Sequence, residues 1–553
     1  MMSENLCAVC NNPGEKKCPS CKVIHYCSLE HQKQHWDEHK NNCFCYEVQS
    51  SDVFGKHLIA RRDLERGEVI FSEVPLLFGP KPTPIDNGPF PCVGCSQLLN
   101  QETSDKCEAC LWPCCSKKCP GLGDNLRHGL ECKILRLSKG GLNSNESFYK
   151  KFRFDILIVL RTLLLQKVDK EKWDELMDLE AYLGKRGQGT KIHRIVDEKV
   201  KYLQENYLNP LKSYEQETKN NIIPMVDTKT LHKIYGILDV HSTELNGQMN
   251  AALLYLKSSV IEHNCTPNTM QAIENADNKY RIIVRASTNI KKGEKITTMY
   301  THILWGTTAR RRNLWQKKYL QCFCDRCKDP TEFGTYFNAL KCMGTEKEPC
   351  GGSQLPSNPT DLNSVWNCDK CKISLPNDDV MEFVNHLGNE VDKVLAKDAG
   401  VKDLEDILKK LLVFLHPNHY HVYTVKHSLV QLYARSEGDV SDEEFTKKFE
   451  MCQDLIGITK KLDPGNARLS IYLAVLQNEL FLGKFSLLQK RFNKESKDVF
   501  KEEVDAMRKM LEEASDALKY EIGSLTGQKM NEVICLNKVK FIGWMKENGM
   551  VDL

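Results

Sequence analysis

Cysteine spacing constrains this chain more than any other feature. The 553 residues include 25 cysteines, most of them in pairs that a few residues separate. The N-terminus, MMSENLCAVC, lacks the apolar core of a secretory signal. No apolar run approaches the roughly 20 residues that span a bilayer. We therefore expect the protein in the nucleus, the cytoplasm or both, where thiols stay reduced and paired cysteines bind metal more often than they form disulfides.

The first cysteine cluster occupies the start of the chain. CAVC and CPSC precede the stretch YCSLEHQKQHWDEHKNNC, whose C-x3-H and H-x3-C spacings put each pair on one face of a helix. Eight nitrogen and sulfur ligands satisfy two tetrahedral zinc ions. The expected ligands are Cys7, Cys10, Cys18, Cys21, Cys27, His31, His39 and Cys43. His35 lies on the same helical face, but both sites are already full, so we expect it to pack beside them.

A second cluster repeats the same order of spacings. Its members are again eight, and its last four again read C-x3-C and H-x3-C. The expected ligands are Cys92, Cys95, Cys107, Cys110, Cys115, Cys119, His128 and Cys132. Two clusters with one plan indicate two more zinc ions.

The trio CFCDRC is one ligand short of a structural zinc site. It contributes Cys322, Cys324 and Cys327, and the nearest unassigned cysteine upstream is Cys265. We expect Cys265 to be the fourth ligand, which would tie two distant segments together. The alternative, a buried free thiol, leaves the trio unexplained.

The remaining cysteines divide into one further set and four single residues. The set could form a ribbon-like zinc site, although its first spacing, C-x7-C, is irregular; its members are Cys342, Cys350, Cys368 and Cys371. We expect the single residues to be packed thiols; they are Cys45, Cys114, Cys452 and Cys535. The count implies up to six zinc ions.

Composition and charge narrow the function classes. Hydrophobic residues make up 41% of the chain and charged residues 27%, as in ordinary soluble proteins. The formal net charge is only +3, so no overall field recruits nucleic acid or anionic membrane. The length predicts about three to four domains.

The segments between the clusters predict strands first and helices later. ARRDLERGEVIF from Ala60 matches ASTNIKKGEKIT from Ala286, and with YRIIVRA they predict small β-hairpins and not a wound α/β sheet. Residues 147–209 have helical length and period, and Asn209-Pro210 is expected to close them. From about residue 373 the chain predicts helices, interrupted by the turn LDPG at 462–465. They resemble tetratricopeptide pairs without a clean repeat of about 34 residues; a peptide-binding groove and a cover for a catalytic domain both remain open.

On these residues the chain resembles the SET and MYND domain family, and in detail its arthropod-specific SmydA-like branch. The resemblance rests on the finger ending in YCSLEHQKQHWDEHKNNC, the second finger inside the SET domain, EHNCTPN, GEKITTMY and CFCDRC. The tract DPTEFGTYFNALKC narrows it to the branch. It covers nearly the whole chain.

The resemblance implies a protein-lysine N-methyltransferase that uses S-adenosylmethionine on histone or other proteins and regulates gene expression. Catalysis would rest on aligning a neutral amine with the methyl group, helped by a tyrosine hydroxyl and backbone carbonyls. The matching tyrosine ends GEKITTMY, so Tyr300 is the catalytic candidate. The alternative for Tyr300 is a packed strand aromatic, because strands favour tyrosine.

Several positions depart from the family pattern. The cofactor-binding Gly-x-Gly reads Gly55-Lys56-His57, and loss of a glycine at a close approach is not neutral. The family's NHSC reads Glu262-His263-Asn264-Cys265; an ionised Glu262 could accept from the cofactor ammonium but would repel its carboxylate. His241 aligns with another cofactor-contacting asparagine. Lys318 and Leu320 replace an aromatic pair before the cysteines, with Tyr319 between them, which weakens the walls of a lysine channel.

A second hypothesis is a catalytically weak or inactive SET scaffold. MYND fingers of the family bind proline-containing peptides against a Q-x-x-H-W helix, and Gln32 and Trp36 supply those residues here. The second finger lacks them and is expected to be structural. A RING-like ubiquitin ligase is disfavoured by the helical spacings. Nucleic-acid binding through Arg310, Arg311 and Arg312 is weakly supported, because such a run is more often a solvated helix face.

The expected fold is α+β and multidomain: a SET core of small β-hairpins with zinc-stabilised fingers and an all-α C-terminal domain. The expected order is a MYND finger (1–43), the first part of SET (44–91), the inserted finger (92–132), a helical insertion (133–245), the SET core (246–305), a post-SET zinc segment (306–330), a zinc-ribbon-like segment (331–372) and TPR-like helices (373–553). We expect a monomer, because no uncovered heptad or long apolar edge is present.

Overall fold

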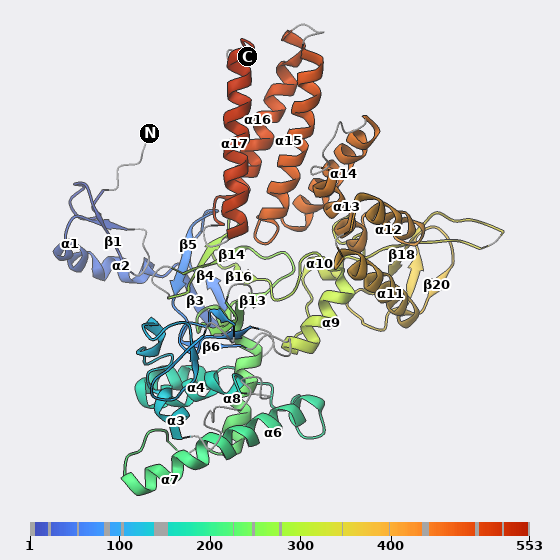
Figure 1. Cartoon of the computed structure of the whole chain (residues 1–553). Helices are drawn as coiled ribbons and strands as arrows, with labels where there is room; N and C mark the ends of the chain where they lie inside the picture. Colours follow the sequence, from blue (N-terminus) through green and yellow to red (C-terminus); the bar gives the residue numbers. More distant parts are fainter. Residues whose placement is uncertain are drawn as a thin grey trace.

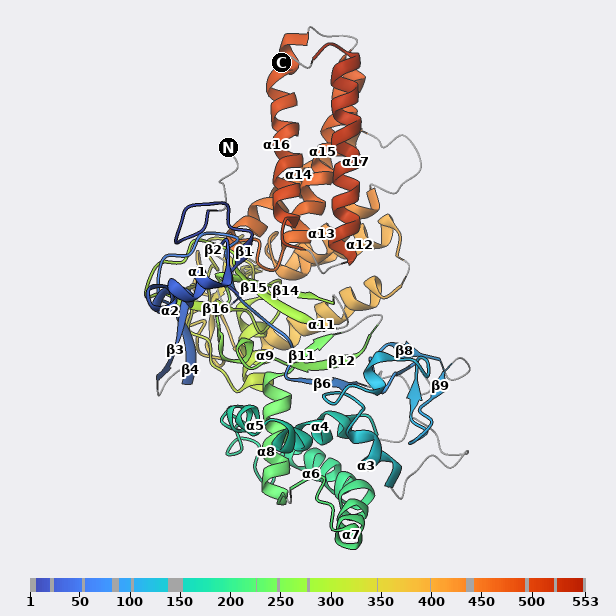
Figure 2. The same cartoon turned by 90° about the vertical axis from the view of Figure 1, so that its left-hand side faces the viewer.

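The computed structural model describes residues 6–19, 24–51, 55–81, 89–100, 104–137, 153–224, 226–245, 249–275, 279–345, 347–397, 399–433, 442–492, 497–521 and 525–550. Short sheets lie at the centre, and a finger, two helical parts and a ribbon-like segment project from them in different directions (Figure 1). Figure 2 shows the two zinc fingers on opposite sides of these sheets.

Three small sheets form the centre. Their strand orders are β13-β16-β4-β3, β14-β15-β5 and β11-β12-β6, and every pairing is antiparallel except the parallel pair β13-β16. Alternate side chains such as Leu58, Ile282 and Val284 point into one core and are at most 1% exposed. The bounds are β3 (Tyr46–Ser51), β4 (Gly55–Ala60), β5 (Val69–Glu73), β6 (Leu77–Pro80), β11 (Thr243–Leu245), β12 (Ala251–Leu254), η3 (Ser258–Val260), β13 (Glu262–His263), β14 (Thr269–Glu274), β15 (Arg281–Ala286) and β16 (Lys295–Thr298). The prediction of small hairpins is confirmed.

The two matching segments of the sequence pair with each other. Leu64 and Ile290 exchange both backbone hydrogen bonds, at 2.8 and 3.0 Å. Ala60 N–H donates to the Glu294 carbonyl, and Ala286 N–H donates to the Glu68 carbonyl in the reciprocal position. The repeated pattern therefore marks two halves of one core that wrap around each other.

The inserted finger and the helical insertion share a second core. Helix α4 is buried nearly all round, as expected of a helix with apolar residues on every face. It packs so closely on β6 that a Cβ on Gly79 would come within 2.4 Å of Ile158, which explains the glycine. The bounds are β7 (Phe90–Pro91), β8 (Leu98–Leu99), β9 (Asp105–Lys106), β10 (Pro113–Cys114), η1 (Pro120–Leu122), α3 (Glu131–Leu137), α4 (Asp155–Val168), α5 (Lys170–Met177), α6 (Lys191–Leu203), η2 (Gln204–Leu208), α7 (Asn209–Thr218) and α8 (Thr228–His241).

The expectation that Asn209-Pro210 closes this helical segment is wrong. The helical path runs on from α6 through the π-helical turn η2 into α7, and Pro210 stands in the first turn of α7. Proline is tolerated there because the first backbone N–H groups of a helix have no partner within it. The proline therefore opens a helix.

The first finger and the post-SET region consist of short elements. The first finger contains β1 (Lys16–Lys17), β2 (His25–Tyr26), α1 (Leu29–Gln34) and α2 (Trp36–Cys43). The post-SET region contains α9 (Thr307–Lys318) and α10 (Asp325–Lys328). A four-stranded antiparallel sheet follows, with β17 (Leu340–Lys341), β18 (Ser353–Pro356), β19 (Trp366–Cys368) and β20 (Ser374–Leu375) in sequence order.

The C-terminal part is helical, as predicted. Each helix packs against the next one along the chain, from α11 to α17. The turn at 462–465 separates α14 from α15, again as predicted. The bounds are α11 (Asn377–Leu395), α12 (Val401–Phe414), α13 (Tyr420–Tyr433), α14 (Asp442–Leu462), α15 (Ser470–Phe492), η5 (Lys497–Phe500), α16 (Lys501–Leu518) and α17 (Leu525–Glu547).

Helix α15 is long and apolar. Among the described residues it is the one helix that is long and apolar enough, by length and composition alone, to cross a membrane. It packs against α14, α16 and α17, and side chains such as Leu476 and Phe481 are at most 1% exposed. This is the environment of a core helix in a helical bundle.

Candidate active site and zinc centres

The first finger brings four expected ligands into one cluster. The donor atoms of Cys7, Cys10, Cys27 and His31 all lie within 4.8 Å of one another. The Ser28 hydroxyl caps α1 by accepting from the His31 backbone N–H, which fixes the start of the helix that carries the imidazole. Three thiols and an imidazole this close together fit a structural zinc ion.

The rest of the first finger is described in part. The sulfur atoms of Cys18 and Cys43 are 3.7 Å apart, and His39 is buried. Cys21, expected to complete this set, lies outside the described residues. His35 stacks on His39, and its Nδ1 lies 3.1 Å from the Tyr26 hydroxyl, so it has the packing role expected of it.

The second finger holds two interleaved clusters. In each, the four donor atoms lie within 4.8 Å of one another, and the burial is high. The first consists of Cys92, Cys95, Cys115 and Cys119, and the second of Cys107, Cys110, His128 and Cys132. The strand pairs β7-β8 and β9-β10 hold the turns that carry the cysteines. Both donor sets fit zinc.

Sequence reasoning missed a buried ion pair behind this finger. Glu131 Oε1 lies 3.3 Å from Nδ1 of His128 and accepts a hydrogen bond of 2.6 Å from Arg161. Arg161 also donates to the carbonyls of Phe78 and Val93, and both charged side chains are at most 1% exposed. A carboxylate in this position orients an imidazole ligand and raises its basicity. The sequence signal for this contact was HGLEC, in which Glu131 stands one helical turn after His128.

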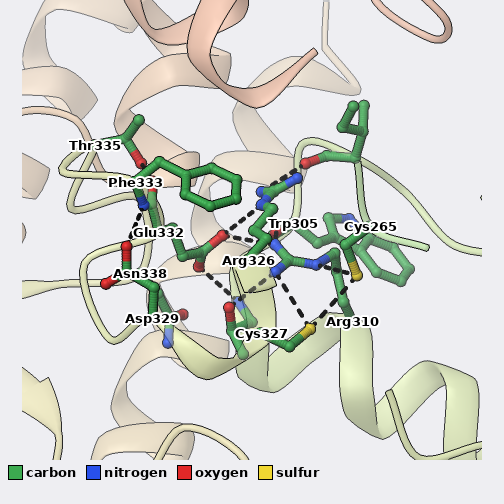
Figure 3. A network of polar contacts seen from close by, with 12 residues as sticks. Cys265, Trp305, Arg310, Arg326, Cys327, Asp329, Glu332, Phe333, Thr335 and Asn338 are labelled. Carbon is green, nitrogen blue, oxygen red and sulfur yellow. Dashed lines mark hydrogen bonds and ion pairs between the residues drawn. The ribbon is translucent and has the colours of Figure 1, made fainter. Parts of the chain in front are cut away.

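The post-SET cluster joins two distant segments. Cys265 lies with Cys322, Cys324 and Cys327, all donor atoms within 4.8 Å, and the Cys265 sulfur is 3.5 Å from that of Cys327. Arg310 Nε donates to the Cys265 sulfur at 3.3 Å, as Figure 3 shows. Four thiolates around one zinc ion carry excess negative charge, which the buried guanidinium offsets.

Glu332, in the tract that follows the cysteines, closes the network of Figure 3. Its carboxylate is buried, accepts from Arg310 at 2.7 Å and Arg326 at 2.8 Å, and caps α9 through the Thr307 N–H. Burial opposes its ionisation, but the two guanidinium groups hold the pKa of Glu332 below its usual value.

The interpretation of the arginine run as a solvated helix face is wrong for two of its three members. Arg310 and Arg311 are 0% and 3% exposed, and Arg311 donates to the carbonyls of Cys322 and Thr360. They serve the zinc cluster and the ribbon segment, which removes them from any nucleic-acid surface.

The ribbon-like segment forms a fifth cluster. Cys342, Cys350, Cys368 and Cys371 have donor atoms within 4.8 Å of one another. Adjacent strands of the β17-β20 sheet bring them together despite the irregular spacing, because antiparallel pairing places strand ends side by side. The cluster fits a structural zinc ion.

The four single cysteines differ in environment. Cys45, Cys114 and Cys452 are buried, as expected of packed thiols. Cys535 is exposed on α17, so the prediction that it is a packed thiol was wrong. The position follows an apolar run, but the run's helical period turns this residue outward.

At the expected cofactor end, Gly55 leaves open space. Its φ is +62°, and apart from Gly55 and its chain neighbours no heavy atom of the described residues lies within 4 Å of the place where a Cβ would stand. Lys56 forms an exposed ion pair with Asp178 of the helical insertion. His57, in place of the second glycine, is buried, and its Nδ1 lies 3.1 Å from the Gly55 carbonyl. The imidazole is therefore buried on the face of β4 opposite to Leu58.

Glu262 is partly neutralised. Its Oε2 lies 2.9 Å from Lys295 Nζ on the neighbouring strand, in an orientation that is not a hydrogen bond, and this buried oxygen has no hydrogen-bond partner among the described residues. The lysine supplies the compensating charge that sequence reasoning did not foresee. An ammonium group of a ligand would share this carboxylate with Lys295.

His263 and Tyr300 form one unit. The Tyr300 backbone N–H donates to Nδ1 of His263 at 3.0 Å, and its hydroxyl donates to the Ile261 carbonyl. Burial raises the pKa of the Tyr300 phenol, with Tyr182 and Glu262 adding to the effect. The tyrosine therefore stays neutral and keeps its proton for hydrogen bonding.

The expected cofactor contact His241 is already engaged. At the end of α8, its Nε2 lies 2.9 Å from the Glu180 carbonyl, and burial lowers its pKa. Nearby, the Lys318 ammonium donates to the Val240 carbonyl and lies 5.6 Å from the centre of the Tyr300 ring. His241 therefore directly follows the residue, Val240, whose carbonyl binds the lysine beside Tyr300.

Comparisons with known proteins place these features in a family. The family model described as the MYND finger matches residues 7–43, and the SET domain model matches residues 55–301. The Drosophila melanogaster SET domain-containing protein SmydA-8, isoform A, is 24% identical over 84% of this chain and 92% of its own length.

Two further relatives carry enzyme names. Histone-lysine N-methyltransferase ASHR1 of Arabidopsis thaliana is 26% identical over 69% of this chain and 75% of its own. Histone-lysine N-methyltransferase SET5 of Saccharomyces cerevisiae is 25% identical over 50% of this chain and 59% of its own. A solved SET domain of LSMT bound to lysine and AdoHcy covers 84% of this chain and 93% of its own, at 12% identity; its TM-score of 0.26 is too low to support an argument.

Sheets, fingers and matches together define a SET domain protein with a MYND finger. The chain belongs to the SET and MYND domain family, on its SmydA-like branch.

Proposed function

We propose that this chain is an S-adenosylmethionine-dependent protein-lysine N-methyltransferase that acts on histone or other proteins. The observation that carries the proposal is the unit of Tyr300 and His263, which holds a partly buried, neutral phenol where the SET domain model ends. Relatives named histone-lysine N-methyltransferases support the proposal.

The residues Gly55, Glu262 and Tyr300 are compatible with S-adenosylmethionine as the cofactor. S-adenosylmethionine, when bound, supplies an electrophilic methyl group on a sulfonium. The open space at Gly55 permits close approach of a ligand to the backbone, and the Glu262 carboxylate, which already pairs with Lys295, can also accept from the cofactor ammonium. In the proposed reaction the Tyr300 hydroxyl helps to orient the substrate amine, which reacts in its neutral form, so positioning rather than acid–base chemistry carries the reaction.

Calorimetric titration of S-adenosylmethionine into the zinc-replete chain tests the binding step, with Glu262→Asn measured in parallel. We expect micromolar binding by the native chain. Methyl transfer to a histone mixture should fall at least tenfold in Tyr300→Phe while zinc content is unchanged. Absence of binding in the native chain together with binding by Glu262→Asn would contradict the proposal and indicate a SET fold without catalysis.

A second candidate function is peptide recruitment through the first finger. The Trp36 side chain is 39% exposed beside the half-buried Gln32 on consecutive helices, as a peptide-binding surface requires. We propose that proline-containing peptides bind there. Trp36→Ala should abolish peptide binding without loss of zinc, whereas an unchanged affinity would contradict this role.

We also propose that the protein works in the nucleus, the cytoplasm or both, as a regulator of gene expression. Reduced thiols in five described clusters suit either compartment. Fractionation of cells that express the tagged chain tests the location, and recovery only from a secreted fraction would contradict it.

A further inference from the structure

Lys318 stands at the end of α9, four residues before the first cysteine of the post-SET cluster. Its side chain turns back toward the SET core. The Nζ donates to the Val240 carbonyl, in the last turn of α8, and lies 5.6 Å from the centre of the Tyr300 ring. A primary amine of this chain is therefore held beside the candidate catalytic tyrosine.

The surroundings of Lys318 lower the cost of removing its proton. Burial lowers the pKa of Lys318; Glu244 and Asp239 oppose the shift, and Lys317 adds to it. Burial and, to a smaller degree, the nearby charge of Lys318 lower the pKa of His241, which keeps this imidazole uncharged near neutral pH. A lowered pKa increases the fraction of a lysine side chain that is neutral and can act as a nucleophile.

A backbone carbonyl, a tyrosine and a neutral amine are the groups that methyl transfer needs on its acceptor side. We propose that Lys318 is an internal methyl acceptor, so that the chain N-methylates this residue in itself. This inference rests on the proposed function, because the methyl donor is S-adenosylmethionine.

The reaction balances without another reactant. The lone pair of Lys318 Nζ forms the new N–C bond while the C–S bond of the donor breaks and its electron pair stays on sulfur. The nitrogen then loses a proton to water. The products are S-adenosylhomocysteine and N-methyllysine at position 318.

A purely structural role for Lys318 predicts a different outcome. An ammonium group that binds the last carbonyls of a helix stabilises its C-terminus, and an arginine does the same. Lys318→Arg therefore keeps the charge and the cap but removes the acceptor amine. Lys317→Arg alters the exposed neighbour and serves as the matched control.

The experiment incubates zinc-replete full-length chain with methyl-labelled S-adenosylmethionine and maps the label by tandem mass spectrometry. We expect label on Lys318 at least tenfold above any other lysine, unchanged in Lys317→Arg and absent in Lys318→Arg and Tyr300→Phe. The rate per chain should stay constant on tenfold dilution, because the acceptor is intramolecular. Calorimetry with S-adenosylhomocysteine should show equal binding by the native chain and Lys318→Arg.

Three results would overturn the inference. A rate that falls with dilution would place the acceptor amine in another copy of the chain. Binding of S-adenosylhomocysteine and methylation of histones without label on Lys318 would leave the proposed function intact but contradict the inference. Lys318 would then block the place of the substrate lysine, most clearly if Lys318→Met speeds histone methylation. Absence of S-adenosylhomocysteine binding in both the native chain and Glu262→Asn would remove the proposed function and the inference together.

Discussion

At the scale of single residues, buried charges explain more of this protein than its surface does. The two carboxylates Glu131 and Glu332 each stand against buried arginines, next to a cysteine cluster. A buried ion pair contributes little net stability by itself, but removal of one partner leaves a charge without compensation. The fold is therefore stable only if each of these carboxylates keeps its arginine partner.

Glu131→Gln should destabilise the second finger. The change leaves Arg161 buried without its counter-charge and weakens the contact that orients His128. We expect a loss of about 3 to 5 kcal/mol in the free energy of unfolding and a zinc affinity about 10- to 100-fold lower. Denaturant unfolding and chelator competition measure the two effects, and a change below 1 kcal/mol would show that Arg161 finds other partners.

Glu332 should make stability depend on pH. Its pKa is lower in the folded chain than in the unfolded chain, so its contribution is full above the unfolded value of about 4.3 and is lost as the pH falls through the folded value. The difference in free energy of unfolding between the native chain and Glu332→Gln should therefore be constant from pH 8 to 6 and shrink below about pH 4. An unchanged difference at low pH would contradict the assignment.

At the scale of elements, the turn between α14 and α15 reaches into the SET core. Arg468 donates to the Thr298 hydroxyl at 2.9 Å and to the Met299 carbonyl at 3.0 Å, directly before Tyr300. Asp463 accepts from the backbone N–H groups of 467–469 and fixes the turn. The C-terminal helices thus support the strand end that carries the candidate catalytic tyrosine.

Arg468→Ala should loosen that strand end. Loss of the two charge-assisted hydrogen bonds should cost about 2 kcal/mol and speed amide hydrogen exchange at 298–301. Arg468→Lys, which keeps one donor and the charge, should recover part of the protection. Hydrogen-exchange mass spectrometry measures both, and equal exchange in all three chains would show that the contact does not position Tyr300.

At the scale of the whole molecule, several small cores share their stability with metal clusters. The SET core, the insertion with the second finger, and the C-terminal helices each bury their own apolar set. The post-SET cluster is different, because Cys265 belongs to the SET core and its partners follow α9. That cluster links the SET sheets to the post-SET segment.

Cys265→Ser should remove one zinc ion per chain and lower Tm by several degrees, because a structural zinc site contributes folding free energy directly. Cys535→Ser, at the exposed position, is the control and should change neither quantity. Elemental analysis and differential scanning calorimetry provide the measurements. A full zinc complement in Cys265→Ser would mean that three cysteines hold the ion.

Much of the fold was predictable because cysteine spacing and hydrophobic period are local. Paired cysteines on tight turns and C-x3-H on helices define clusters before any tertiary contact forms, and the small hairpins and C-terminal helices follow from periods of two and 3.6 residues. The same reasoning failed at Asn209-Pro210, at the buried arginines and at Cys535, where packing partners from other segments decide the outcome.

The sequence by itself therefore determined the candidate ligands, the kinds of elements and the family, whereas the structure divided the ligands of the second finger into two interleaved sets. Only the tertiary structure decided which groups compensate each buried charge: Lys295 at Glu262, Arg161 at Glu131, and two arginines at Glu332. It also decided that the Lys318 amine lies beside Tyr300. The reason is physical: a charge must be neutralised where it is buried, and its partner can come from any part of the chain that folding brings within a few ångströms.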